Sequence, residues 1–98
     1  MKRLKVSVTQ EHIRKGKRRM GGLGCPVFLA LKEHEATLEF HNLRVTSVSS
    51  LYVYFGLGIP GIPVLSLPEV ETQRIRHYDR AGEMEPHTFT LDISPLGD

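Results

Sequence analysis

The sequence predicts an α+β fold in one small domain, and three observations support this. Apolar and polar residues alternate with a period of two near both ends of the chain and in its middle, as in half-buried strands. Three other segments carry helix-start signals ahead of helical patterns. The chain has 98 residues, too few for two units that each bury a core, so we expect a single domain over residues 1–98.

The first predicted elements are a strand and a short helix. Residues 4–8, LKVSV, alternate in hydrophobicity and suit a strand with one buried face. Thr9 is a suitable N-cap, and it places Val8 and Ile13 at the two positions that touch in a hydrophobic staple. Gly16 suits the left-handed conformation that ends many helices, so the helix is expected to be about two turns long.

A second helix is predicted after a glycine-rich loop. Residues 17–24, KRRMGGLG, combine basic side chains with three glycines, which favours a loop. Pro26 is suited to the first turn of a helix. Residues 27–31, VFLAL, are apolar on all sides, so this helix is expected to lie in the core and to return to water over residues 32–35.

The middle of the chain predicts a hairpin and a third β segment. Residues 36–41 and 45–48 carry strand patterns separated by a turn. In the third segment Leu51, Val53 and Phe55 form one face, and Tyr52 and Tyr54 form the other.

A third helix and a last strand complete the pattern. The spacing of Ser66 and Glu69 is that of a capping box, and Gly82 is a suitable stop, so we expect a helix over residues 67–81. One arc of this helix holds Leu67, Val70, Ile75, Tyr78 and Ala81, but Glu71 and Arg74 fall inside it. Residues 89–93 alternate as a closing strand. The predicted order is β-α-α-β-β-β-α-β, with a mainly antiparallel sheet and the helices packed on one face.

Composition limits the classes of function. A single cysteine cannot form an internal disulfide, and no apolar stretch has the length of a signal peptide or a membrane span. We therefore expect a protein of a reducing cytoplasm with no membrane partner. Eight of the thirteen Lys and Arg lie in the first nineteen residues, whereas acids outnumber bases from Glu69 onward, so one end of the chain is strongly positive.

Five stretches together resemble small accessory proteins encoded by bacteriophages and prophages. They are VTQEHIRKG from residue 8, CPVFLALK from residue 25, LPEV from residue 67, IRHYDR from residue 75 and EPHTFTL from residue 85. The resemblance spans most of the chain except residues 36–66 and implies a bacterial host cell, but it transfers no catalytic residue. Arg74 departs from it, because an aromatic residue is frequent there. Small phage proteins of this size include inhibitors that bind bacterial defence complexes such as CRISPR effectors, an analogy of context and size.

Three features are candidate reactive sites. Cys25 precedes a helix start, which favours a thiolate, but its apolar neighbours are typical of a buried, inert cysteine. The five histidines lack zinc-site spacing, so exposed or turn histidines are the preferred interpretation. The GGLG segment has no nucleotide-binding motif around it, which favours a connector. We therefore expect no enzyme, no metal site and no cofactor.

Partner binding is the preferred function, and three sets of residues are its candidates. The basic run is either a binding face for phosphates or an acidic protein, or simply a solvated face. Arg74 is either an interface anchor or the partner of Glu71 on the same helix. The apolar loop from Gly56 to Pro63 either covers the core or meets a partner or a second copy of the chain. The candidate residues are Arg14, Lys15, Lys17, Arg18, Arg19, Arg74, Leu57, Ile59 and Ile62.

The sequence thus predicts a phage-type protein that inhibits a host defence complex by docking on a host protein or ribonucleoprotein. The alternative is a basic accessory protein that binds nucleic acid through its N-terminal segment. A homodimer is a further alternative for the apolar loop.

Overall fold

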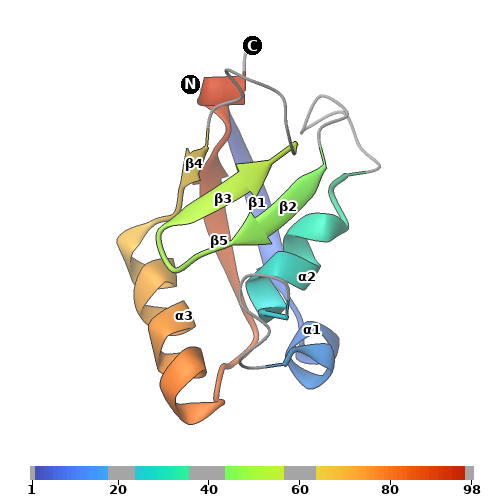
Figure 1. Cartoon of the computed structure of the whole chain (residues 1–98), viewed down its shortest axis with the longest axis vertical. Helices are drawn as coiled ribbons and strands as arrows, with labels where there is room; N and C mark the ends of the chain where they lie inside the picture. The colour runs from blue at the N-terminus through green and yellow to red at the C-terminus, as the bar shows by residue number, and fades with distance from the viewer. Residues whose placement is uncertain (1, 18–23, 36–43, 57–63, 97–98) are drawn as a thin grey trace.

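The computed structural model describes residues 2–17, 24–35, 44–56 and 64–96. Its fold is α+β, as predicted. The elements, labelled in Figure 1, are β1 (Arg3–Val8), α1 (Gln10–Lys15), α2 (Pro26–Lys32), β2 (Val45–Val48), β3 (Tyr52–Phe55), β4 (Leu65–Ser66), α3 (Glu69–Ala81), β5 (His87–Asp92) and a closing 3-10 turn, η3 (Ser94–Leu96).

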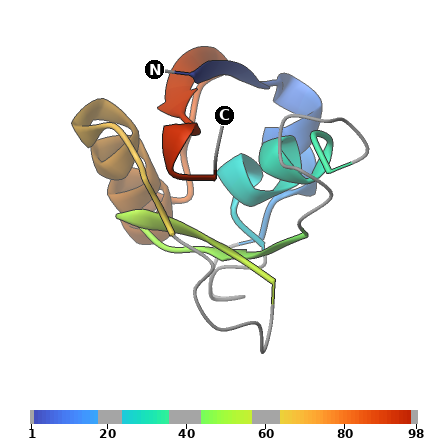
Figure 2. The same cartoon turned by 90° about the horizontal axis from the view of Figure 1, so that it is seen from above.

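The described strands form two antiparallel sheets instead of the single sheet expected from the sequence. Strand β1 pairs with β5, with Leu4 opposite Leu91 and Val6 opposite Phe89. Strands β2, β3 and β4 form the second sheet in that order. The two sheets face each other, with α2 on one side and α3 on the other (Figures 1 and 2). The helices thus do not all cover one face, because the sheets cover each other.

One apolar cluster joins all of these elements. The alternation in β1 and β5 directs every second side chain inward, and these side chains meet those of β2, β3 and β4. Helix α2 is the most buried helix, as its composition predicts, since Pro26, Val27, Phe28, Ala30 and Leu31 are all buried. Burial at about 25 cal/mol per Å² of apolar surface makes this shared core the main source of stability.

Strand β2 contains a bulge that its sequence alone does not show. Val45 and Val48 are both buried although they are three residues apart, a spacing that a regular strand directs to opposite faces. The register shifts between Val45 and Ser47, and the extra residue turns both valines inward. The first residue of this strand is fixed by Glu35, which follows α2 and accepts a hydrogen bond of 2.6 Å from the Val45 N–H.

The predicted order matches the described order in its letters, but the three middle strands differ. The structure has β2, β3 and β4 there, whereas the sequence predicted strands at residues 36–41, 45–48 and 51–55. The first of these lies outside the described residues. Strand β4 was missed because its two residues are too short to show a period.

The start of α1 is as predicted, but the role of Gly16 is not. The Thr9 side chain accepts a hydrogen bond from the His12 N–H, and the His12 ring in turn accepts one from the Thr9 N–H, so the two residues form a reciprocal capping box. Gly16 has φ −65° and ψ 151°, an extended conformation open to any residue. Glycine is required there by space: a Cβ would lie 2.8 Å from Cγ of Pro26 and 2.9 Å from the Tyr78 hydroxyl oxygen.

Helix α3 ends as predicted but begins differently. Gly82 has φ 74° and closes the helix in the left-handed conformation. The predicted Ser66 capping box is wrong, because Ser66 belongs to β4 and the N-cap is Pro68, with no side-chain cap. The buried face is also rotated from the predicted arc: Val70 is exposed, whereas the side chains of Glu71, Thr72, Ile75 and Tyr78 are buried.

Candidate partner-binding surface

The described part of the basic segment is exposed but does not form one compact patch. Arg14, Lys15 and Lys17 lie at the end of α1, and Lys15 pairs with Glu11 at 2.7 Å. Figure 1 shows α1 beyond the end of β1 instead of beside it, so these cations lie away from Arg3 at the start of the strand. The cations of α1 and those of β1 thus do not converge on one face. Arg18 and Arg19 lie outside the described residues.

Arg74 belongs to a buried polar cluster that also contains Glu71 and His87. The Arg74 Nη1 donates to Glu71 Oε1 at 3.1 Å, which confirms the predicted pair along the helix. The Glu71 side chain is 0% exposed, and His87 Nε2 lies 2.9 and 2.8 Å from its two oxygens. Glu71 can therefore lie within the apolar arc of the helix, because Arg74 and His87 both make hydrogen bonds to its carboxylate there.

His87 was not predicted as a partner of Glu71, although the sequence carried a signal. It lies two residues before Phe89 on β5, so a period of two places its ring on the inward face. A histidine on the buried face of a strand needs a polar partner, and Glu71 was the acid on the buried face of the neighbouring helix. Because the two are sixteen positions apart, only the fold shows that they meet.

Cys25 has the surroundings of a structural thiol. It is buried at the N-cap of α2, and it makes no side-chain cap hydrogen bond. Burial raises the pKa of its thiol to about 11, and this outweighs the opposite effect of the nearby backbone N–H groups of Val27 and Phe28. A protonated thiol is a poor nucleophile, so this geometry favours the inert interpretation.

The described histidines each have local partners. His12 Nδ1 accepts from the Thr9 N–H at 2.9 Å, so Nε2 carries the ring proton and donates to Glu33. In the part of the chain that the structure describes, no three His, Cys, Asp or Glu residues gather as a metal would need. His41 and most of the GGLG segment lie outside that part.

An aromatic and aliphatic surface on the second sheet is the feature that sequence reasoning did not single out. Among the described residues, five large hydrophobic side chains are exposed, with 36% to 58% of their surface accessible, and two of them are the tyrosines of β3. We call this surface the aromatic face; its members are Leu51, Tyr52, Tyr54, Val64 and Val70. They come from the start and outer side of β3, the residue before β4 and the first turn of α3.

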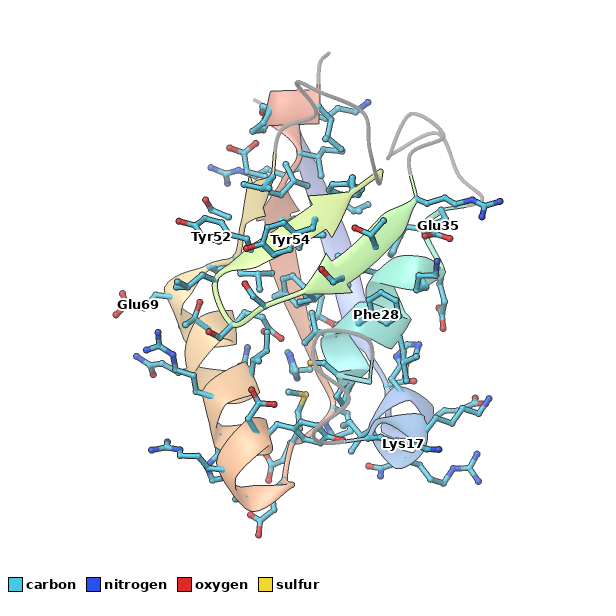
Figure 3. The ribbon with its side chains drawn as sticks, in the orientation of Figure 1. Lys17, Phe28, Glu35, Tyr52, Tyr54 and Glu69 are labelled. Atoms are coloured by element: carbon cyan, nitrogen blue, oxygen red, sulfur yellow. The ribbon has the colours of Figure 1, made fainter. Side chains whose placement is uncertain are left out.

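The two tyrosines form the centre of the aromatic face. Figure 3 shows Tyr52 and Tyr54 side by side on the outer side of β3, and their rings meet edge to face at 6.2 Å between centroids. The period of two predicted their shared face. It also placed Leu51 on the face of Val53 and Phe55, but Leu51 precedes the strand and is exposed, and its N–H donates to the Ser49 hydroxyl in a bend.

The surroundings of the tyrosines are mainly uncharged. Ser66 is opposite Tyr52, and Ser47 is opposite Tyr54, so hydroxyl groups flank both rings. Arg44 and Glu69 are exposed charges near the ends of β2 and α3. Leu57, Ile59 and Ile62, the predicted apolar partner residues, lie outside the described residues.

The proposal of a function rests on the fold and on the surface of the protein, because comparisons with known proteins found no match. No protein-family model, no curated protein and no solved structure matches the chain. Among the described helices, none is long and apolar enough to cross a membrane.

Proposed function

We propose that the protein is a stoichiometric binding protein that docks another protein on its aromatic face. The observation that supports this is the pair of exposed tyrosines on the outer side of β3, Tyr52 and Tyr54, whose rings meet edge to face. Isolated exposed apolar residues are normal, but a contiguous group is typical of an interaction site. Cys25 is not a competing nucleophile, because its thiol is buried and its pKa is raised to about 11.

The composition of the face favours a protein over a nucleic acid as its partner. Interface centres are rich in tyrosine and poor in charge, and Tyr52 and Tyr54 flanked by Ser47 and Ser66 match that composition. Single-stranded nucleic acid also stacks on aromatic rings, but it needs a groove of cations along its backbone. Here Arg44 is the one described cation adjoining β2 and β3 in sequence.

The resemblance to phage accessory proteins supplies the class of partner. We propose a component of a bacterial defence complex, such as a CRISPR effector, met in the cytoplasm of the host cell. Because the chain carries a net charge of +2, it does not mimic the phosphates of a DNA duplex, so inhibition has to come from docking on a protein surface.

The test is an interference assay in cells with an active CRISPR effector, with direct binding to the purified effector. We expect the chain to restore transformation by a targeted plasmid, and Tyr52→Ser with Tyr54→Ser to weaken binding about tenfold or more, as hot-spot tyrosines do. The matched control is Thr88→Ala with Thr90→Ala on the outer side of β5. Full interference in the presence of the wild-type chain would reject this partner class, and an equal loss in the control would reject the surface.

A nucleic-acid partner is the second candidate, and the exposed cations of α1 favour it. Replacing Arg14, Lys15 and Lys17 with Ala would then weaken binding to any duplex and flatten its salt dependence by about 0.9 in log–log slope for each phosphate that is no longer neutralised. Binding to the effector protein that is insensitive to these changes supports the aromatic face instead.

A further inference from the structure

A cavity of about 330 Å³ lies between the second half of α3 and the segment that leads into β5. From α3 it is lined by Arg74 and His77. From the other side it is lined by residues 83–87, which include Met84, Pro86 and His87. This volume is at the small end of ligand sites, so it suits a small group better than a large cofactor.

The group formed by Arg74, Glu71 and His87 at this cavity carries a net positive charge. His87 Nδ1 lies 2.7 Å from the Glu85 carbonyl oxygen, which only accepts, so this nitrogen donates. His87 Nε2 and the Glu71 carboxylate are 2.8 Å apart and therefore share a second proton, whichever of the two holds it. The His87–Glu71 pair is then neutral as a unit, and the charge of Arg74 is left over.

Arg74 is held in place while most of its hydrogen-bonding capacity stays unused. Its guanidinium has five N–H donors, and only Nη1 has a partner among the residues that the structure describes. The side chain is 39% exposed, although the carboxylate that holds it is fully buried. A guanidinium fixed in this way has already lost part of its conformational freedom, which lowers the cost of binding a planar oxyanion.

Two acidic residues, Glu83 and Glu85, also line the cavity, and both are exposed to water. Glu83 is 79% exposed at its side chain and lies 3.7 Å from His77 Nε2. Glu85 is exposed and contributes its backbone carbonyl to His87. Water screens these two exposed carboxylates strongly, and it screens the half-buried Arg74 less, because the Arg74 side chain is 39% exposed.

We infer that this cavity binds an oxyanion, either a carboxylate or a phosphate group, through the free edge of the Arg74 guanidinium. The exposed His77 also lines the cavity and can supply a second donor, while Met84 and Pro86 supply apolar walls. Glu71 and His87 act as positioning residues that hold Arg74. The inference is independent of the aromatic face, because no residue of that face lines the cavity among the described residues.

The experiment is an NMR titration of the full chain with sodium phosphate and, separately, sodium acetate, each against sodium chloride at matched pH and ionic strength. We expect saturable shifts of the His87 and His77 ring signals with phosphate, acetate or both, and none with chloride. A response to phosphate alone identifies a phosphate site, and a response to acetate alone identifies a carboxylate site. Linear shifts that are equal for all three salts would overturn the inference.

Two variants tie the binding to Arg74. Arg74→Gln, checked for folding by its amide spectrum, should weaken the anion about tenfold or more, the loss typical of a charged hydrogen bond. Arg76→Gln, two residues along the same helix, is the matched control and should bind as the wild type does. If Arg74→Gln does not fold, Arg74→Lys keeps the charge, lacks the planar fork and should also bind more weakly. Unchanged affinity in a folded Arg74 variant would refute the assignment.

Discussion

Gly16 gives the sharpest test of how this chain packs, because two physical effects predict opposite outcomes for Gly16→Ala. Its backbone is extended, so alanine fits without strain and should stabilise the protein by about 0.4 to 1 kcal/mol through the unfolded chain. However, the new Cβ would lie 2.8 Å from Cγ and 3.0 Å from Cδ of Pro26, and 2.9 Å from the Tyr78 hydroxyl oxygen. Both neighbours are buried, and the proline ring cannot rotate away.

The steric effect should dominate. Overpacking of this kind costs about 1 to 3 kcal/mol, so we expect a net loss of about 1 to 2 kcal/mol in the free energy of unfolding. For a domain of this length each kcal/mol lowers the melting temperature by about 4 to 8 °C, which thermal denaturation followed by circular dichroism resolves easily. A variant as stable as the wild type would refute the reasoning and show that α1 moves away from α2 and α3 freely.

A second glycine separates close packing from backbone strain. Gly82→Ala should also lose about 1 kcal/mol, but for a different reason, since its φ of 74° disfavours any side chain. Adding Tyr78→Phe removes one of the atoms that the Gly16→Ala methyl would meet. A double-mutant cycle should therefore show coupling of about 0.5 kcal/mol or more for Gly16 with Tyr78. Coupling as large for Gly82 would contradict the close approach at Gly16.

Two further predictions concern the buried polar groups. Because burial raises the Cys25 pKa to about 11, the unfolded thiol ionises first as pH rises above about 9. Unfolding calorimetry should show a loss of roughly 2 kcal/mol by pH 11 that is absent in Cys25→Ala. Alkylation of the native protein at pH 7 should be far slower than alkylation in denaturant. Equal losses in both proteins would remove Cys25 as the cause. Glu71→Ala should cost about 3 to 5 kcal/mol, since it leaves His87 and Arg74 without their carboxylate, while Arg74→Ala should cost about 1 kcal/mol or less because its side chain is partly in water. Chemical denaturation measures these losses in the two single variants, in the double variant and in the exposed control Glu69→Ala. Additive losses in the double variant would argue against an energetic coupling of Glu71 and Arg74.

The parts of the fold that the sequence predicts are those set by neighbours in the chain. The alternation over residues 4–8 and 89–93 gives β1 and β5, since a strand needs only a period of two. The all-apolar run after Pro26 gives the buried helix α2, and Gly82 ends α3. Each of these depends on interactions within about one turn of helix or one strand.

The parts that the sequence does not predict depend on interactions between distant residues. The division into two sheets follows from the pairing of β1 with β5, the two ends of the chain. The bulge in β2 follows from a register that only β3 defines. The candidate surface has the same origin, since Leu51 and Val70 both come from patterns that predict burial, yet the bend before β3 and the rotation of α3 expose them.

The rotation of α3 connects the packing of the helix to its charges. Hydrophobicity alone places Val70 at one edge of the buried arc, but the structure exposes Val70 and buries Glu71, which His87 meets from β5. Replacing a buried ionic group with apolar residues of similar volume is often neutral or stabilising, so stability alone does not account for a carboxylate at this position. The carboxylate does have one effect that an apolar residue lacks: it fixes the Arg74 guanidinium at the wall of a cavity. We therefore connect the energetic cost of burying Glu71 to the positioning of the Arg74 guanidinium. The buried carboxylate, which the sequence pattern predicts least, would then serve the proposed oxyanion site.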